Sequence, residues 1–106
     1  MIKVALLSRS GRLNGFRVTG HAGFAESGSD IVCASVTAAV QLTANGITEC
    51  ADVPAEIEVQ ESLVSLLLPV RCQSEVAFKM LEAFALEVKL LAEDYNDYVV
   101  LTNAEV

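Results

Sequence analysis

The chain has 106 residues, of which 53% are hydrophobic and 20% are charged, and its formal net charge is -7. This length and composition fit one compact soluble domain over residues 1–106, and two domains would be hard to fit into a chain of this length. The mean hydropathy of +0.47 is high. No apolar run approaches the ~18 residues of a membrane span, so we expect a buried homodimer interface rather than a membrane protein.

Charge is distributed unevenly along the chain. Residues 1–48 carry four basic and two acidic side chains, and residues 49–106 carry three basic and twelve acidic ones. This balance argues against nucleic acid as a direct partner and permits attraction to a basic protein, although acidity also serves simply to keep a domain in solution. The apolar start at residues 1–7 is too short for a secretory signal, so we expect a cytoplasmic protein.

The N-terminal third predicts a hairpin followed by a loop. Residues 2–8 and 14–20 have the composition of strands and flank a polar turn at residues 10–12. Residues 20–30 hold three glycines and two serines with almost no periodicity. We therefore expect a mobile loop there.

A helix is predicted directly after this loop. Apolar residues and alanines recur from Ile31 onward, and Ser29 or Asp30 is a suitable N-cap. The helix either continues to residue 50 or ends at Asn45-Gly46.

The second half predicts a second hairpin and a second helix. Residues 56–60 alternate polar and apolar side chains, and a leucine-rich segment follows at residues 63–68. From Ser74 an apolar stripe steps by three and four residues: Ala77, Leu81, Phe84, Val88, Leu91, Tyr95. Residues 98–101 could add a short last strand. The expected fold is α+β, in the order ββαββα(β), with two helices packed against a small, mostly antiparallel sheet.

Three cysteines stand at wide spacings, which fits neither a disulfide framework nor a zinc site, so we expect no metal and no cofactor. On one helix, Cys33 and Cys50 would lie about 25 Å apart, too far to pair. Unpaired cysteine is usually a small buried hydrophobic residue, and this is our expectation for Cys50 and Cys72.

One catalytic constellation is available, formed by the single histidine, His21, and Cys33. With Asp30 as N-cap, Cys33 is the third helical residue, where unsatisfied N–H groups and the helix dipole favour a thiolate. An imidazole in reach takes the thiol proton and later gives it to a leaving amine, as in a Cys-His peptidase. The same N–H groups are candidates for an oxyanion hole.

Two further side chains are candidates for supporting roles. Asp30 either caps the helix or orients His21 as a third catalytic group. Thr37 lies four residues after Cys33, so its hydroxyl either approaches the site or bonds back to its own helix. Judged by residue type alone, a single histidine and a helix-start cysteine are more often structural than catalytic.

A family resemblance is carried by two neighbouring stretches, GHAGFA at residues 20–25 and GSDIVCASV at residues 28–36. Together they resemble the signature of the ribosomal-processing cysteine protease family, Prp, and the similarity extends over the whole chain in length and element order. The resemblance implies a cytoplasmic, homodimeric endopeptidase. It also implies a substrate, the precursor of large-subunit ribosomal protein twenty-seven, from which a short N-terminal extension is removed.

By position in the motif, the resemblance implies that His21 is the catalytic histidine and Cys33 the nucleophile. It makes Gly20 the residue that lets the loop move, with Asp30 and Thr37 as supporting positions. The family usually has serine where Thr37 stands, which keeps the hydroxyl. The implied substrate is apolar or aromatic before the cut and rich in lysine after it, which an apolar groove on an acidic surface would suit.

Two functions of different classes are consistent with the sequence. The first is a cysteine endopeptidase that works through an acyl-enzyme thioester. The second is a non-catalytic dimeric module that binds or assembles a ribosomal protein, in which Cys33 is buried and inert. The reactivity of Cys33 toward a thiol reagent, compared with that of Cys50 and Cys72, distinguishes them.

Overall fold

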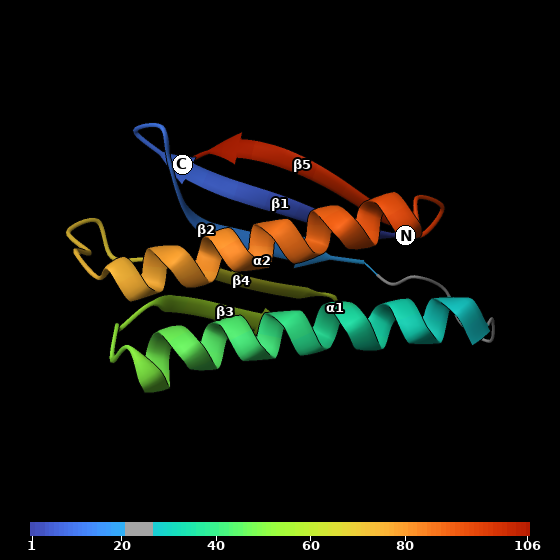
Figure 1. Cartoon of the computed structure of the whole chain (residues 1–106), viewed down its shortest axis with the longest axis horizontal. Coiled ribbons are helices and arrows are strands. Elements are labelled where there is room, and N and C mark those ends of the chain that lie inside the picture. Colours follow the sequence, from blue (N-terminus) through green and yellow to red (C-terminus); the bar gives the residue numbers. More distant parts are fainter. Residues whose placement is uncertain (21–26) are drawn as a thin grey trace.

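Both helices lie on the same face of a five-stranded sheet, which makes a two-layer α+β architecture (Figure 1). The computed structural model describes residues 1–20 and 27–106, without the side chains of residues 27–30. The helices are α1 (Ser27–Asn45) and α2 (Glu75–Asp94). The expected α+β class with two helices on one sheet is confirmed.

The first predicted hairpin is present. Strands β1 (Ile2–Arg9) and β2 (Arg12–Thr19) pair antiparallel. The two residues between them, Ser10 and Gly11, have φ of 54° and 79°. Two successive positive φ values define the type I′ turn, whose twist matches that of the flanking strands. The second strand therefore begins two residues earlier than expected.

The first helix begins earlier than predicted, at Ser27 rather than near Ile31, so the expected loop over residues 20–30 is too long at its C-terminal end. Serine and glycine are weak helix formers, and this is why the composition suggested a loop; extending an existing helix by one turn costs little. At its other end α1 stops at Asn45 and continues as a π-helical turn, η1 (Gly46–Cys50).

The second hairpin and the second helix lie where they were predicted. Strands β3 (Glu56–Gln60) and β4 (Leu63–Leu67) pair antiparallel. Ser74 caps α2, with its side-chain oxygen accepting from the N–H of Ala77 at 3.1 Å. The buried face of α2 includes most of the predicted stripe: Ala77, Leu81, Phe84, Val88, Leu91.

The last strand changes the character of the sheet. β5 (Val99–Glu105) runs parallel to β1, and the strand order is β3-β4-β2-β1-β5. The sheet is therefore mixed, and the expectation of a mostly antiparallel sheet is corrected. Most side chains of β5 are exposed, so its later residues lack the apolar pattern by which a strand is recognised in a sequence.

The core lies between the sheet and the two helices. Phe16 on β2 stacks on Phe84 of α2, with ring centroids 4.3 Å apart. α1 packs more closely against α2 than against any strand. The side chains of β3 are all exposed, and most of those of β4 are only partly buried.

One segment, residues 31–50, is long and apolar enough to cross a membrane by length and composition. The sequence-based expectation that no segment reaches this length is therefore wrong. In the fold, this segment contributes four side chains to the hydrophobic core: Val32, Val36, Val40, Ile47. A helix with one face in the core of a folded domain passes the same composition test, and one face of residues 31–50 lies in the core.

Candidate active site

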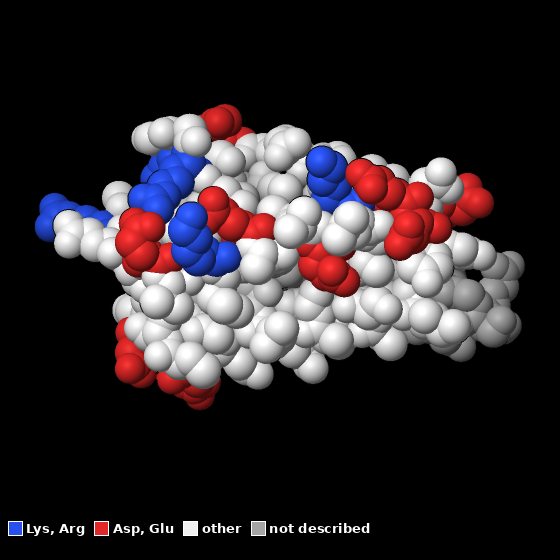
Figure 2. Space-filling model, viewed as in Figure 1, with Lys and Arg blue, Asp and Glu red and all other residues white. Residues whose placement is uncertain are grey.

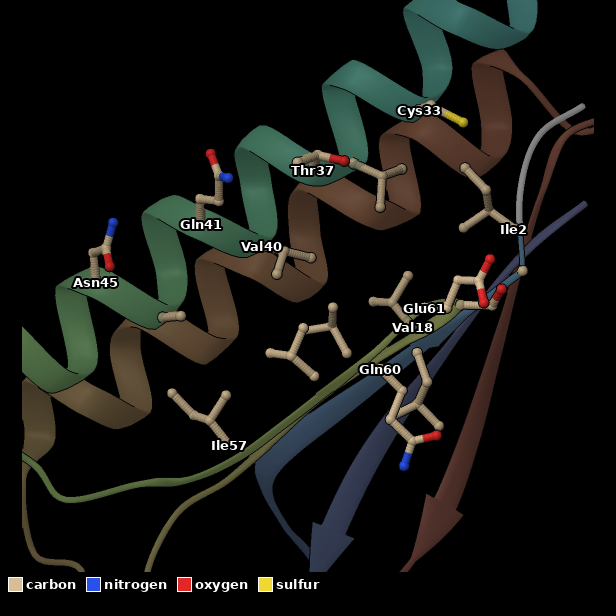
Figure 3. A pocket seen from close by; sticks show the side chains of 17 residues that line it. Ile2, Val18, Cys33, Thr37, Val40, Gln41, Asn45, Ile57, Gln60 and Glu61 are labelled. Atoms are coloured by element: carbon tan, nitrogen blue, oxygen red, sulfur yellow. The ribbon is translucent and has the colours of Figure 1, made fainter. Parts of the chain in front are cut away.

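A groove of about 430 Å³ lies between α1 and the sheet (Figure 3). Its lining is largely apolar and comes from α1, from β2 and from the β3–β4 hairpin: Val18, Val36, Val40, Ile57, Val59, Val64. Among the described residues that line it, Glu61 is the only charged one. The groove therefore suits a largely uncharged ligand with one place for a positive group.

Cys33 lines this groove from α1, at the opposite end from Asn45 (Figure 3). Its side chain is partly buried and forms no disulfide. The sequence-based alternative of a fully buried, inert Cys33 does not fit this position. A thiol that is accessible from a groove has the placement that a nucleophile requires.

The helix start does not activate Cys33 in the way the sequence suggested. Because α1 begins at Ser27, Asp30 is the fourth helical residue, not the N-cap, and Cys33 is the seventh. The unsatisfied N–H groups belong to residues 27–30, which lie between about 4.5 and 9 Å along the axis from Cys33, and the dipole effect fades within the first turn. Their role as an oxyanion hole stays a prediction. The side chain of Asp30 lies outside the described part of the structure.

Thr37 lines the groove one helical turn beyond Cys33. Figure 3 shows both side chains on the same side of α1. The expectation that these two residues share a helix face is confirmed, whereas the supporting role of the Thr37 hydroxyl stays a prediction.

Gly20 lines the same groove from the end of β2. Its N–H donates to the carbonyl oxygen of Ser62 at 3.1 Å, which joins it to the β3–β4 turn. His21 lies outside the described residues, but the residue directly before it is thus at the groove that contains Cys33. The role of Gly20 in loop movement stays a prediction.

We expect Gly20→Ala to destabilise the fold and to lower activity. Gly20 has a φ of +83°, and an added Cβ would meet the carbonyl oxygen of Met1. The positive φ is unfavourable for alanine, and the added Cβ would crowd the Met1 carbonyl. Together these effects should lower the free energy of unfolding by about 1–3 kcal/mol. Gly11→Ala is the matched control, because Gly11 has a φ of +79° but open space around its Cα. Urea unfolding of both variants measures the difference, and equal losses would contradict the close-contact argument.

The other two cysteines differ from each other. Cys72 is partly buried, as a small hydrophobic residue should be, whereas Cys50 is exposed at the end of η1. The expectation that Cys50 is a buried hydrophobic residue is wrong. Cys50 must consequently be removed before the reactivity of Cys33 is compared with that of a buried thiol. In the part of the chain that the structure describes, no group of His, Cys, Asp and Glu side chains could hold a metal ion.

Several groove residues were missed by the sequence analysis. Gln41 and Asn45 of α1 also line the groove. Each four-residue step along a helix turns by about 40°, so their spacing from Cys33 and Thr37 did not predict this position. Glu61 and Ser62 of the β3–β4 turn also line the groove. Their contribution depends on tertiary packing, which no local pattern reveals.

A thiol on a helix beside an open groove, in a two-layer α+β fold, is an arrangement suited to a small cysteine protease. Comparison with known proteins agrees with this class. Residues 1–100 match the family model of cysteine protease Prp. The chain therefore belongs to the cysteine protease Prp family.

Individual relatives agree with this assignment. The chain is 30% identical over 92 residues to the ribosomal processing cysteine protease Prp of Bacillus subtilis (strain 168), covering 82% of each protein. It superposes on the crystal structure of SMU.848 from Streptococcus mutans with a TM-score of 0.90 and 29% identity, over 100% of this chain and 96% of that one. The S. aureus ribosomal processing protease Prp, solved with a covalently linked product peptide, has the same fold, with a TM-score of 0.86 and 23% identity over 98% of this chain and 100% of that one.

Proposed function

We propose that this protease removes the N-terminal extension from the precursor of large-subunit ribosomal protein twenty-seven, with Cys33 as nucleophile and His21 as general base. The observation that carries the proposal is that Cys33 and Gly20, the residue before His21, line one groove. The names of the B. subtilis and S. aureus relatives, both ribosomal processing proteases, support a ribosomal protein as substrate.

The proposed reaction has two halves. His21 takes the proton of the Cys33 thiol, and the thiolate attacks the scissile carbonyl carbon. The tetrahedral intermediate collapses with cleavage of the C–N bond, His21 gives its proton to the leaving amine, and a thioester remains on Cys33. Water then attacks the thioester, His21 accepts one water proton and passes it to the departing thiolate, and the acid product loses its remaining proton to solvent and leaves as the carboxylate.

Activation of Cys33 depends on His21 in this proposal. Cys33 lies beyond the first turn of α1, where the helix dipole no longer favours the thiolate. An imidazolium next to the sulfur is therefore the stabilising group that the sequence offers.

The groove fits the implied substrate in two respects. Its apolar lining suits the apolar or aromatic residues before the cut, and Glu61 offers a carboxylate to a lysine after it. We expect Glu61→Gln to lower kcat/KM for a lysine-containing peptide about two- to fivefold at low salt, because an exposed pair contributes little more than that. At high salt the two proteins should converge.

Glu49→Gln is the matched control for Glu61→Gln, since Glu49 is also exposed and does not line the groove. Peptide cleavage kinetics at low and high salt provide the measurement. If wild type and Glu61→Gln show the same kcat/KM at low salt, electrostatic capture at this position is excluded.

Cleavage of the proposed substrate is tested with the full precursor of the ribosomal protein. After incubation with the protease, the product mass should correspond to one cut at the end of the extension. A precursor that keeps its mass would overturn the proposed substrate. Cleavage at many positions would overturn the proposed specificity.

We also propose that the protein acts in the cytoplasm as a homodimer, without direct contact to nucleic acid or membrane. Ile31 and Leu42 on the outer side of α1 are 58% and 70% exposed. No charged residue occurs between residues 31 and 45, and Figure 2 shows α1 as a largely uncharged surface below the charged side chains of α2. Sedimentation equilibrium should give twice the 11.3 kDa of one chain; a monomer mass would contradict the dimer.

A further inference from the structure

The end of the groove that lies away from Cys33 begins with two apolar residues on the same face of α1 as the thiol. Val40 and Ala44 line the groove seven and eleven residues after Cys33. Because a helix turns by about 100° per residue, both lie within about 20° of Cys33 around the helix axis. Figure 3 shows the Val40 side chain between α1 and the strands. The helix thus presents the thiol and these two side chains on one face.

The sheet supplies the opposite wall of this end. Ile57 and Val59 of β3 line the groove and are 45% and 70% exposed. Val64 of β4 pairs with Val59, so its side chain continues the same apolar face of the sheet. We call Val40, Ala44, Ile57 and Val59 the distal apolar subsite. Its exposed apolar side chains are free to be covered by a ligand.

The two ends of the groove differ in charge. Figure 3 shows Cys33 and Glu61 near one end and Ile57 near the other. Along β3, Ile57 comes four residues before Glu61, which corresponds to about 13 Å of extended chain. No charged side chain belongs to the distal apolar subsite. A lysine after the cut therefore finds its carboxylate near Cys33, which leaves the apolar end of the groove to the part of the substrate before the cut.

The distance from the thiol selects one position in the substrate. Val40 lies about 10 Å beyond Cys33 along the helix axis. An extended chain advances about 3.3 Å per residue, so about three residues separate the one attacked at Cys33 from the one beside Val40. The residue beside Val40 is then the fourth before the cut.

We propose that the distal apolar subsite selects an aliphatic side chain at the fourth residue before the cut. The inference rests on the proposed peptidase function, whose chemistry takes place at Cys33. It also fixes the direction of the substrate, with the part before the cut toward Ala44 and the basic part after it toward Glu61. Val40, Ala44 and Ile57 are then specificity-determining residues that take no part in bond cleavage.

The test measures peptide binding by fluorescence anisotropy in the Cys33→Ala background, so that no peptide is cut. The probes are peptides that span the extension junction of the ribosomal protein. Two of them differ only at the fourth residue before the cut, which is leucine in one and alanine in the other. A second pair differs in the same way at the fourth residue after the cut. The ratio of the two Kd values within a pair is the preference for leucine.

Two variants change the distal apolar subsite in opposite ways. Ala44→Leu fills it, and Ile57→Ala removes part of its wall. Ala38→Leu is the matched control for the first and Val100→Ala for the second, because both positions are exposed and neither lines the groove. If Ala44→Leu does not fold, Ile57→Ala decides the result, since Ile57 is 45% exposed and contributes little to the core.

We expect the leucine peptide of the first pair to bind about three- to tenfold more tightly than the alanine peptide, the effect of partial burial of one leucine side chain. Ala44→Leu should abolish this preference, and Ile57→Ala should lower it by at least about twofold. Both controls should keep it. A purely structural role would weaken both peptides equally and leave the preference unchanged.

Three results would overturn the proposal. The first is a preference that is the same in all variants. The second is a preference that responds to Ala44→Leu and Ile57→Ala only in the second pair, which would reverse the direction of the substrate. The third is loss of the dimer by Ala44→Leu in sedimentation equilibrium, with unchanged peptide preference, which would assign this end of the groove to a second copy of the chain.

Failure of this inference is distinguishable from failure of the proposed function. Wild-type protein that cuts the precursor, together with unchanged preferences in the variants, would overturn the distal apolar subsite alone. A wild type that leaves the precursor intact would overturn the proposed substrate, and the preferences measured in the Cys33→Ala background would still support or contradict the subsite. Peptides that are neither bound nor cut would overturn both.

Discussion

Cys33→Ala should abolish cleavage of the precursor, with a loss of more than about 10⁴-fold in kcat, because no other group in the proposed mechanism forms the thioester. The fold should persist. Cys33 is only partly buried, so removal of its sulfur should change the free energy of unfolding by less than about 1 kcal/mol. Product formation measured by mass spectrometry, with urea unfolding alongside, checks both expectations.

Cys72→Ala is the matched control, since Cys72 is also partly buried and lies outside the groove. It should keep wild-type activity. Residual cleavage by Cys33→Ala at a rate near that of wild type would remove Cys33 from the mechanism. Unfolding of the variant would show that the side chain has a structural role, and Cys33→Ser would then separate the two effects.

His21→Ala should lower kcat by about 10²–10⁴-fold, the usual contribution of a general acid–base group. The same change should slow alkylation of Cys33 by iodoacetamide near neutral pH, because the thiolate loses its stabilising imidazolium. Cys33 lies in the second turn of α1, where the helix dipole gives the thiolate little support. Loss of His21 should therefore slow alkylation more than it would for a thiol in the first turn.

The alkylation measurement requires a Cys50→Ser background, because Cys50 is exposed and would react on its own. In that background the rate at Cys33 is compared with the rate at Cys72 by peptide mass mapping. An unchanged rate at Cys33 in His21→Ala would rule out activation of the thiol by His21. Proton transfer to the leaving amine and activation of the hydrolytic water would then be the roles still open to this histidine.

Elements with a complete local pattern could be predicted from the sequence. α2 has both a stripe at three- and four-residue steps and a serine cap, so its position and buried face were correct. β5 could not be anticipated in full, because its direction and its pairing with β1 depend on a contact between the two ends of the chain. The start of α1 was misplaced because residues 27–30 have the composition of a loop.

The sequence predicted the Cys33 motif of the candidate site but not the groove around it. Cys33 and Thr37 were identified from the sequence because they lie on one helix, four residues apart. The residues that line the groove are spread along the sequence from Ile2 to Val64, on separate strands and on α1. Glu61 reaches the groove only because the β3–β4 hairpin packs beside it. Activation of Cys33 by the helix start was inferred from an N-cap at Asp30. This prediction is wrong, because the helix begins at Ser27 and Cys33 is its seventh residue.

In the proposed mechanism, Cys33 forms a covalent acyl intermediate during peptide cleavage. The most direct measurement is a rapid acid quench of wild-type protein mixed with the precursor, followed by intact mass analysis and fragmentation of the modified peptide. We expect a transient mass increase equal to the acyl part of the substrate, located on Cys33 and absent from Cys33→Ala. Cleavage without any adduct, or an adduct located on Cys50 or Cys72, would contradict it.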